Sequence, residues 1–188
     1  MKLILMFALL TSFYCSVLQA ENPEDVVKEI FDLAMKKEIV KNKSSQQIIN
    51  NKIAFEEMSQ NILGTYVNKI SKTEFQWFQK TITGIITKTV YPEAPSFLDK
   101  VKITYQTPLK LKDKITINSQ VKKRGEEIDV QYILKKIGKS WKVVDIAIDF
   151  ESWTESISEQ VFSVIKKENW SGLKEKLNKK LMELDSAK

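Results

Sequence analysis

The sequence contains no histidine and only one cysteine, Cys15. The absence of an imidazole excludes every mechanism that needs a histidine base or a histidine metal ligand. Cys15 lies in an N-terminal apolar segment that we expect to be removed, so thiol nucleophiles, disulfides and cysteine-bound metals are excluded for the mature chain. We therefore expect no catalytic residue, no metal site and no cofactor.

Glycine and arginine are also scarce. The five glycines form neither a GxGxxG pattern nor a Walker motif, so no phosphate-binding loop is predicted. Arg124 is the only arginine, so 29 of the 30 basic residues are lysine, and the formal net charge is +6. Recognition of bases relies on the planar guanidinium, whereas lysines suit diffuse attraction to anionic partners or membranes, or serve solubility. We expect no nucleic-acid partner.

Residues 1–20 have the layout of a secretory signal peptide. Lys2 provides a positive start, residues 3–10 provide an apolar run, and Ala20 is a small residue before the polar Glu21. The apolar run is shorter than the roughly 20 residues that a membrane-spanning helix needs. We predict cleavage near Ala20, with an uncleaved anchor as the alternative, and we expect residues 21–188 to form a single domain.

Helical patterns occupy both ends of the mature chain. Asn22 and Pro23 before two acidic residues predict a helix start, and Ser71 with Glu74 predicts a capping box. Apolar residues at steps of three and four continue these patterns, and Pro92 predicts a stop. The predicted helices run from residue 22 to a break at 41–44, and over 46–70, 71–90, 96–100, 153–167 and 171 onward.

The middle of the chain alternates apolar and polar residues, which is typical of strands. The predicted strands are 101–106, 114–122, 127–136 and 141–150, with turns at Pro108, Arg124-Gly125 and Gly138-Lys139-Ser140. The predicted fold class is therefore α+β, with a four-stranded antiparallel meander between N-terminal and C-terminal helices.

Several short motifs occur in an order that resembles a known family. They are Ile62-Leu63-Gly64-Thr65-Tyr66, Thr73-Glu74-Phe75, the strand from Trp141 to Ile146 with its W-x-V-x-D pattern, Ser152, and Gly172-Leu173. Together, over about residues 51–180, they resemble the MlaC (toluene-tolerance) family of periplasmic phospholipid carriers. The chain departs from the family after the last predicted strand, where members often have glycine and this sequence has Asp149-Phe150.

The resemblance implies a sheet wrapped by helices around an apolar cavity that receives phospholipid acyl chains. It also implies a periplasmic shuttle between an inner-membrane ABC-transporter complex with an MCE-type subunit and an outer-membrane lipoprotein complex, which maintains outer-membrane lipid asymmetry. The candidate lipid-binding residues are Tyr66, Phe78, Ile82, Ile85, Tyr105, Tyr132, Ile146, Phe150 and Trp153. Without the resemblance they are ordinary core residues, because residue type does not separate the lining of a cavity from a filled core.

We further expect Phe78 and Ile82 to share one helix face, and Ile146 and Phe150 to share one strand face. Our hypothesis is that these two faces oppose each other across the cavity. The alternative function is a secreted interaction module with a filled core and a lysine-rich binding face. Lys122-Lys123-Arg124, at a predicted hairpin tip, belongs to such a face or serves solubility.

Four polar residues near the end of the predicted sheet have a structural interpretation, and three of them also have a chemical one. Asp149 and Glu151 would face the same way on a strand, as a glycosidase pair does, but a polar strand end is the favoured interpretation. Ser152 is most simply a helix N-cap, since no histidine exists to activate it. Asp145, among apolar neighbours, is interpreted as a hydrogen-bonded structural acid.

Overall fold

The computed structural model of the protein describes residues 21–186, so the predicted signal peptide and Cys15 lie outside the described residues. The first helix, α1 (Pro23–Ala34), begins as predicted: the Asn22 side chain accepts a hydrogen bond from the Glu24 backbone N–H (3.2 Å), and Pro23 takes the first helical position. A 3₁₀ turn, η1 (Lys37–Val40), follows. None of the described helices is long and apolar enough to cross a membrane.

The single helix predicted over residues 46–70 is wrong. The segment forms α2 (Lys43–Lys52), α3 (Phe55–Leu63) and a 3₁₀ segment, η2 (Gly64–Lys69). The first break occurs because Ile53 bridges Val143 of the sheet, and the next backbone N–H, of Ala54, donates to the Val143 carbonyl (2.8 Å). The second break occurs at Gly64, whose φ of 49° is the left-handed conformation that favours glycine.

The fourth helix, α4 (Lys72–Phe97), starts at the predicted capping box but does not stop where expected. The Ser71 hydroxyl accepts from the Glu74 N–H, and the Glu74 carboxylate accepts from the Ser71 N–H (2.9 Å). The helix continues across Pro92 and Pro95, so the predicted stop and the separate turn at 96–100 are wrong. Tyr91 on this stretch is buried against α1, η1 and α2, and its hydroxyl donates to Asn50 Oδ1 (2.6 Å). Packing therefore outweighs the unfavourable prolines.

The sheet is antiparallel, as predicted, but it has six strands rather than four. They are β1 (Lys102–Tyr105), β2 (Leu109–Leu111), β3 (Lys114–Lys123), β4 (Glu126–Ile137), β5 (Ser140–Ile148) and β6 (Glu151–Ser152). Their order is β1-β3-β4-β5-β6, and β2 pairs with β3 beyond β1. Pro108, which has no N–H to donate, lies between β1 and β2. The sequence prediction missed β2 because its turn into β3, Lys112-Asp113, contains no glycine, although Lys112 has a φ of 56°.

The predicted turns at Arg124-Gly125 and Gly138 are confirmed: all three residues have positive φ, as two-residue hairpins require. The predicted strand over residues 141–150 ends early, at Ile148. Asp149 and Phe150 form a further turn with φ values of 48° and 68°. Asp149 is held by Asp129, because each donates its backbone N–H to an oxygen of the other. The carboxylates of Asp149 and Glu151 are therefore not neighbours on one strand.

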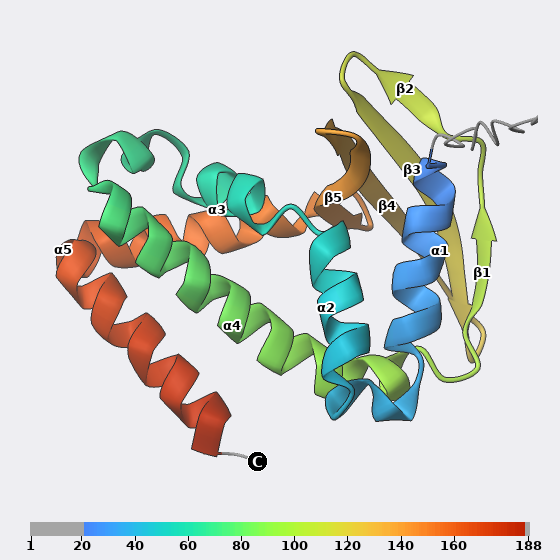
Figure 1. Cartoon of the computed structure of the whole chain (residues 1–188), viewed down its shortest axis with the longest axis horizontal. Helices are drawn as coiled ribbons and strands as arrows, with labels where there is room; N and C mark the ends of the chain where they lie inside the picture. Colours follow the sequence, from blue (N-terminus) through green and yellow to red (C-terminus); the bar gives the residue numbers. More distant parts are fainter. Residues whose placement is uncertain (1–20, 187–188) are drawn as a thin grey trace, which may run out of the picture.

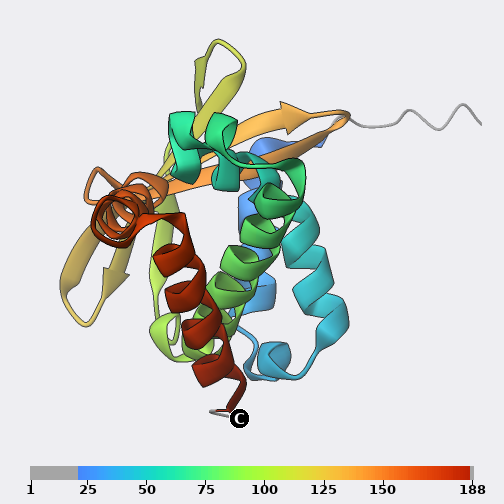
Figure 2. The same ribbon diagram turned by 90° about the vertical axis from the view of Figure 1, so that its left-hand side faces the viewer.

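The last helix, α5 (Trp153–Ser186), is divided at Asn169, which has non-helical dihedral angles (φ 56°, ψ −172°). This division agrees with the predicted helices over 153–167 and from 171. The first half of α5 runs from the sheet past α3, and the second half returns alongside α4 (Figures 1 and 2).

The helices occupy both faces of the sheet. Val26 and Val27 of α1 pack on Ile117 and Tyr132, which lie on one face. Side chains alternate along a strand, so Ile133 faces the opposite side, toward α3 and the start of α5. The protein is thus α+β, with an antiparallel sheet flanked by helices (Figure 1).

Candidate functional site

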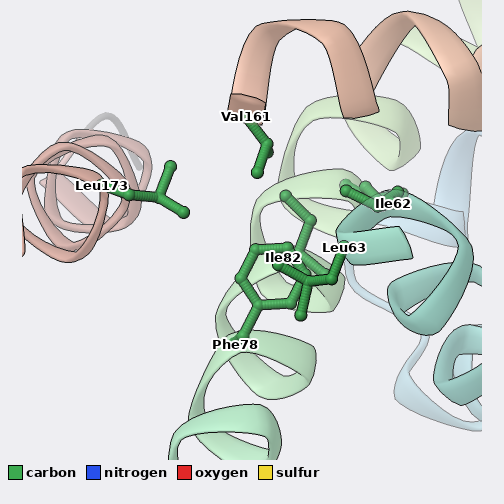
Figure 3. Packing of buried hydrophobic residues seen from close by; sticks show 7 residues of the cluster. Ile62, Leu63, Phe78, Ile82, Val161 and Leu173 are labelled. Atoms are coloured by element: carbon green, nitrogen blue, oxygen red, sulfur yellow. The ribbon is translucent and has the colours of Figure 1, made fainter. Parts of the chain in front are cut away.

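A group of apolar residues from three helices forms an interior beside the sheet. We call this group the helical core: Ile62, Leu63, Phe78, Ile82, Ile86, Val161 and Leu173. Ile62, Leu63 and Phe78 have no exposed side-chain surface. Figure 3 shows Val161 and Leu173 pointing from the two halves of α5 toward Phe78 and Ile82 of α4. The helical core thus depends on contacts among α3, α4 and both halves of α5.

An aromatic cluster packs against the helical core. Its centre is Trp170, which directly follows the break in α5. The Trp170 ring lies 5.6 Å from that of Tyr66 and 6.0 Å from those of Trp77 and Phe78. Its indole N–H donates to Glu74 Oε1 (3.0 Å). The hydrogen bond from the Ser71 backbone, with help from the Ser71 hydroxyl, lowers the pKa of Glu74, so this anchor stays charged.

The second half of α5 covers the helical core along α4. Leu173 near its start is buried, and Leu181 further along comes so close to Gly84 that a Cβ there would lie 3.1 Å from Leu181 Cδ1. At its end Asp185 forms an ion pair with Lys88. This segment is therefore a cover, joined to the rest of the fold through Asn169.

A cleft of about 610 Å³ lies between α3, the first half of α5 and the sheet. Its lining is mixed: Ile133 and Val144 are apolar, and the other lining residues are Gln60, Asn61, Gly64, Lys114, Asp145, Ser152, Thr154, Glu155, Ser158 and Glu159. The Ser158 hydroxyl donates to the Ile62 carbonyl (2.8 Å), and Ile62 belongs to the helical core. The contact between α3 and α5 thus forms a wall that separates the cleft from the helical core. The cleft is more polar than the apolar cavity that we expected.

The Asp145 carboxylate fixes the start of α5 to the sheet. It accepts hydrogen bonds from the Ser152 hydroxyl (2.5 Å), the Thr154 N–H (3.1 Å) and the Ile146 N–H (2.9 Å). The Ser152 hydroxyl oxygen in turn accepts from the Glu155 N–H (3.1 Å). The structural interpretations of Asp145 and Ser152 are therefore confirmed.

The predicted lipid-binding residues fall into separate parts of the structure. Phe78 and Ile82 belong to the helical core, Trp153 packs against it, and Tyr66 belongs to the aromatic cluster. Tyr105, Tyr132 and Ile146 pack instead between the sheet and α1. Ile85 is half-buried on α4, and Phe150 is 73% exposed at the turn after β5.

The structure therefore does not bring the pair Ile146 and Phe150 together, nor set it against Phe78 and Ile82. The physical reason is that β5 ends at Ile148, so the period of the strand does not reach Phe150. The predicted set also leaves out five residues that pack with Phe78 in the helical core or the aromatic cluster: Ile62, Leu63, Val161, Leu173 and Trp170. Their helical spacing was visible in the sequence, but the side-by-side placement of α3 and α5 was not.

Residues 21–186 contain no cluster of three or more His, Cys, Asp or Glu side chains that could hold a metal ion. Burial raises the pKa of Tyr132 and of Tyr91 to about 12. A hydrogen bond to Glu57 raises the pKa of Lys135. These shifts hold the lysine charged and the tyrosines neutral around pH 7.

The fold and the site define an α+β protein with an antiparallel sheet, a helical core of purely apolar side chains and a mixed cleft beside it. The family model of the MlaC protein matches residues 22–179. The chain belongs to the MlaC family.

A solved structure has the same fold. It is the phospholipid-binding protein from Ralstonia solanacearum, determined in complex with a phospholipid, and it is 19% identical to this chain. The match covers 86% of this chain and 96% of that one, with a TM-score of 0.72. A comparison with curated proteins finds no match.

Proposed function

We propose that this protein is a periplasmic phospholipid carrier. The observation that carries the proposal is membership of the MlaC family over residues 22–179. The structural neighbour from Ralstonia solanacearum, which binds a phospholipid, supports it. The carrier takes lipid from one membrane complex and delivers it to another, and so helps to maintain the lipid asymmetry of the outer membrane. Its partners are an inner-membrane ABC-transporter complex with an MCE-type subunit and an outer-membrane lipoprotein complex.

In this proposal the acyl chains enter the helical core, whose own side chains fill it in this structure. Entry from the cleft therefore requires α3 and the first half of α5 to separate, and the head group stays in the mixed lining of the cleft. Burial of each methylene contributes about 0.8 kcal/mol, so one sixteen-carbon chain contributes on the order of 12 kcal/mol. Spontaneous release into water is then slow, and unloading requires contact with a membrane or a partner complex.

The clear pKa shifts of the fold do not prepare a group for acid–base catalysis near neutral pH. A general acid or base works best when its pKa lies near the operating pH. The clear pKa shifts move away from neutral pH, because they raise the pKa values of lysines and tyrosines and lower the pKa of Glu74. The residues concerned are Lys28, Lys52, Glu74, Tyr91, Tyr105, Tyr132 and Lys135.

Native mass spectrometry of protein from the periplasm, followed by solvent extraction, tests the proposal. We expect one diacyl phospholipid per chain in a gently prepared sample and none after extraction. A preparation that is always free of lipid, and that takes up none from vesicles, would contradict the carrier and leave an interaction module. The same sample tests processing, since its N-terminus should lie within two residues of Glu21. Glu21 is part of the fold, because its carboxylate accepts from Lys52 Nζ and from the Trp141 N–H (both 3.2 Å).

A further inference from the structure

The hairpin formed by β2 and the start of β3 stands out from the rest of the molecule (Figures 1 and 2). We call residues 109–114, Leu-Lys-Leu-Lys-Asp-Lys, the leucine–lysine hairpin. Leu109 is 58% exposed and Leu111 is 71% exposed. Both lie on one short strand at a spacing of two, so they point to the same side. The hairpin thus presents two exposed leucines that belong to none of the hydrophobic clusters of the described fold.

The same hairpin carries three lysines. Lys110, Lys112 and Lys114 are all exposed, and none of the ion pairs found among residues 21–186 involves them. Lys114 lies directly opposite Leu111 in the register of β2 and β3, so its side chain is on the leucine side. The one acid of the hairpin, Asp113, lies 3.6 Å from Lys135. The hairpin therefore combines exposed apolar groups with unneutralised positive charge.

We propose that the leucine–lysine hairpin docks on the surface of an anionic phospholipid bilayer. The leucines enter the boundary between head groups and acyl chains, as apolar residues of interfacial segments do. Lys114 extends beside the leucines and places its ammonium group among the lipid phosphates. Lys112 at the turn and Lys110, whose side chain leaves the opposite side of β2, add positive charge next to the same surface. Two leucines and three lysines give a contact that forms and breaks readily, which suits a protein that leaves the membrane again.

The size and composition of the hairpin favour a bilayer over an acidic protein. A stable protein interface covers about 800 Å² on each partner, which is more than a six-residue hairpin tip presents. Strong protein interfaces also centre on Trp, Tyr or Arg, whereas leucine is under-represented at such positions. The hairpin contains none of those three residue types.

The hairpin also lies at the border of the cleft. Lys114, which belongs to the hairpin, is one of the residues that line the cleft beside Ile133. Docking of the hairpin would therefore bring this side of the cleft to the bilayer surface. This step rests on the proposed function, because it treats the cleft as the entrance for lipid, whereas docking itself does not depend on bound lipid.

A fluorescent probe on the hairpin tests the proposal directly. The mature chain predicted from the sequence has no cysteine, so Leu111→Cys and Met182→Cys each provide a single labelling site for an environment-sensitive dye. Met182 is a matched control because it is 62% exposed on the second half of α5. This half of the helix lies away from the hairpin formed by β2 and β3 (Figure 1). With vesicles containing phosphatidylglycerol, we expect the dye at position 111 to gain intensity and shift to the blue. We expect no change for the dye at position 182, or for either dye with pure phosphatidylcholine.

Co-sedimentation with the same vesicles measures the contributions of the side chains. We expect Leu109→Asn with Leu111→Asn to weaken binding by about tenfold or more. Lys110→Gln with Lys112→Gln should weaken it by roughly fivefold per lysine at low salt. The control with the same loss of charge is Lys179→Gln with Lys180→Gln, on the second half of α5, which should bind like the wild type. Melting curves check that every variant is folded.

If the lysine variants at 110/112 and at 179/180 lose vesicle binding equally, the attraction is diffuse and the proposal is overturned. Full vesicle binding by the leucine variant would also overturn it. Binding to an acidic protein but not to vesicles would overturn it in favour of a protein partner. Lipid occupancy, measured on the same variants by native mass spectrometry, separates the two proposals. A hairpin variant that keeps its lipid but ignores vesicles supports docking, and wild-type protein that binds vesicles but never holds lipid contradicts only the carrier.

Discussion

A substitution at Ile82 can distinguish a filled core from a cavity that binds lipid. Ile82 is 5% exposed in the helical core, with Phe78 one turn before it and Ile86 one turn after it. We expect Ile82→Trp to lower the free energy of unfolding of lipid-free protein by about 1–3 kcal/mol, because a larger side chain overpacks this space. We also expect it to reduce lipid occupancy. Chemical unfolding and lipid counting on the same sample measure both effects.

The matched control is Ile49→Trp. Ile49 is 2% exposed but belongs to the cluster among α1, α2 and α4, away from the helical core. This variant should lose similar stability and keep its lipid. If Ile82→Trp loses stability but retains full lipid, the acyl chains lie outside the helical core.

Because Tyr132 is buried, we expect the folded protein to lose stability at high pH. Burial raises the pKa of Tyr132 to about 12, above the value of about 10 for an exposed tyrosine. The unfolded chain therefore releases this proton before the folded chain does, so stability is fully present below about pH 10 and falls as the pH rises toward 12. Tyr132→Phe should flatten this decline, although it removes the contact with the Ser119 hydroxyl (3.3 Å). Urea unfolding between pH 9 and 12 measures the slope, and an unchanged slope would contradict the assignment.

At this scale, the sequence identified which residues are apolar and periodic but not which of them meet. Phe78 and Ile82 were correctly paired by their helical spacing. Phe150 was misplaced, because nothing in Asp149-Phe150 indicates a turn with positive φ, a conformation that bulky side chains rarely adopt. Trp170 could not be identified as the centre of an aromatic cluster, since its partners Tyr66 and Trp77 are distant in sequence.

Among the elements, α5 carries a strained joint. The dihedral angles of Asn169 lie next to a region that is essentially restricted to glycine, and such strain costs on the order of 1–3 kcal/mol. The Asn169 side chain offsets part of this strain by accepting a hydrogen bond from the Ser171 N–H (2.8 Å). Exchange of a capping Asn for Gly typically costs only a few tenths of a kcal/mol.

We therefore expect Asn169→Gly to raise the free energy of unfolding by about 1 kcal/mol. Asn169→Ala should lower it, because alanine keeps the strain and loses the cap. Denaturant unfolding of the two variants gives the signs. A decrease for both would mean that the cap dominates at this joint and that little strain is stored there.

Elements with local signals were predicted well, and elements set by distant contacts were not. The start of α1, the capping box of α4 and two hairpin turns each depend on residues within four positions of one another. The break between α2 and α3 depends on Val143, about ninety residues away in the chain, and the passage of α4 across Pro92 depends on the burial of Tyr91. A sequence read locally contains neither contact.

For the whole molecule, bound lipid should be a source of stability. A ligand that binds only the folded state raises the free energy of unfolding by an amount that grows with its concentration relative to Kd. We expect the melting temperature to fall after solvent extraction and to return when phosphatidylethanolamine or phosphatidylglycerol is added back. Scanning calorimetry measures the change, and equal melting temperatures with and without bound lipid would contradict the burial of acyl chains in the helical core.

The fold class was predictable at this scale because helical and strand periodicities occupy separate stretches of the chain. The number of strands was not, since β2 and β6 contain only three and two residues. The cleft depends on how α3 and α5 sit on the sheet. Asp145 fixes α5 to the sheet and Ser158 joins α5 to α3 through hydrogen bonds, and the W-x-V-x-D motif that contains Asp145 does not reveal these partners.

The interrupted edges of the sheet have a consequence for behaviour at high concentration. A long, flat, unpaired strand edge is a template for aggregation and fibril growth. Here one edge is divided by Pro108 into β1 and β2, and at the other edge the Val143 carbonyl of β5 is already occupied by the Ala54 N–H. A second chain therefore meets only short stretches of free backbone groups on the described sheet. The protein should consequently remain free of strand-mediated aggregates even when it is crowded.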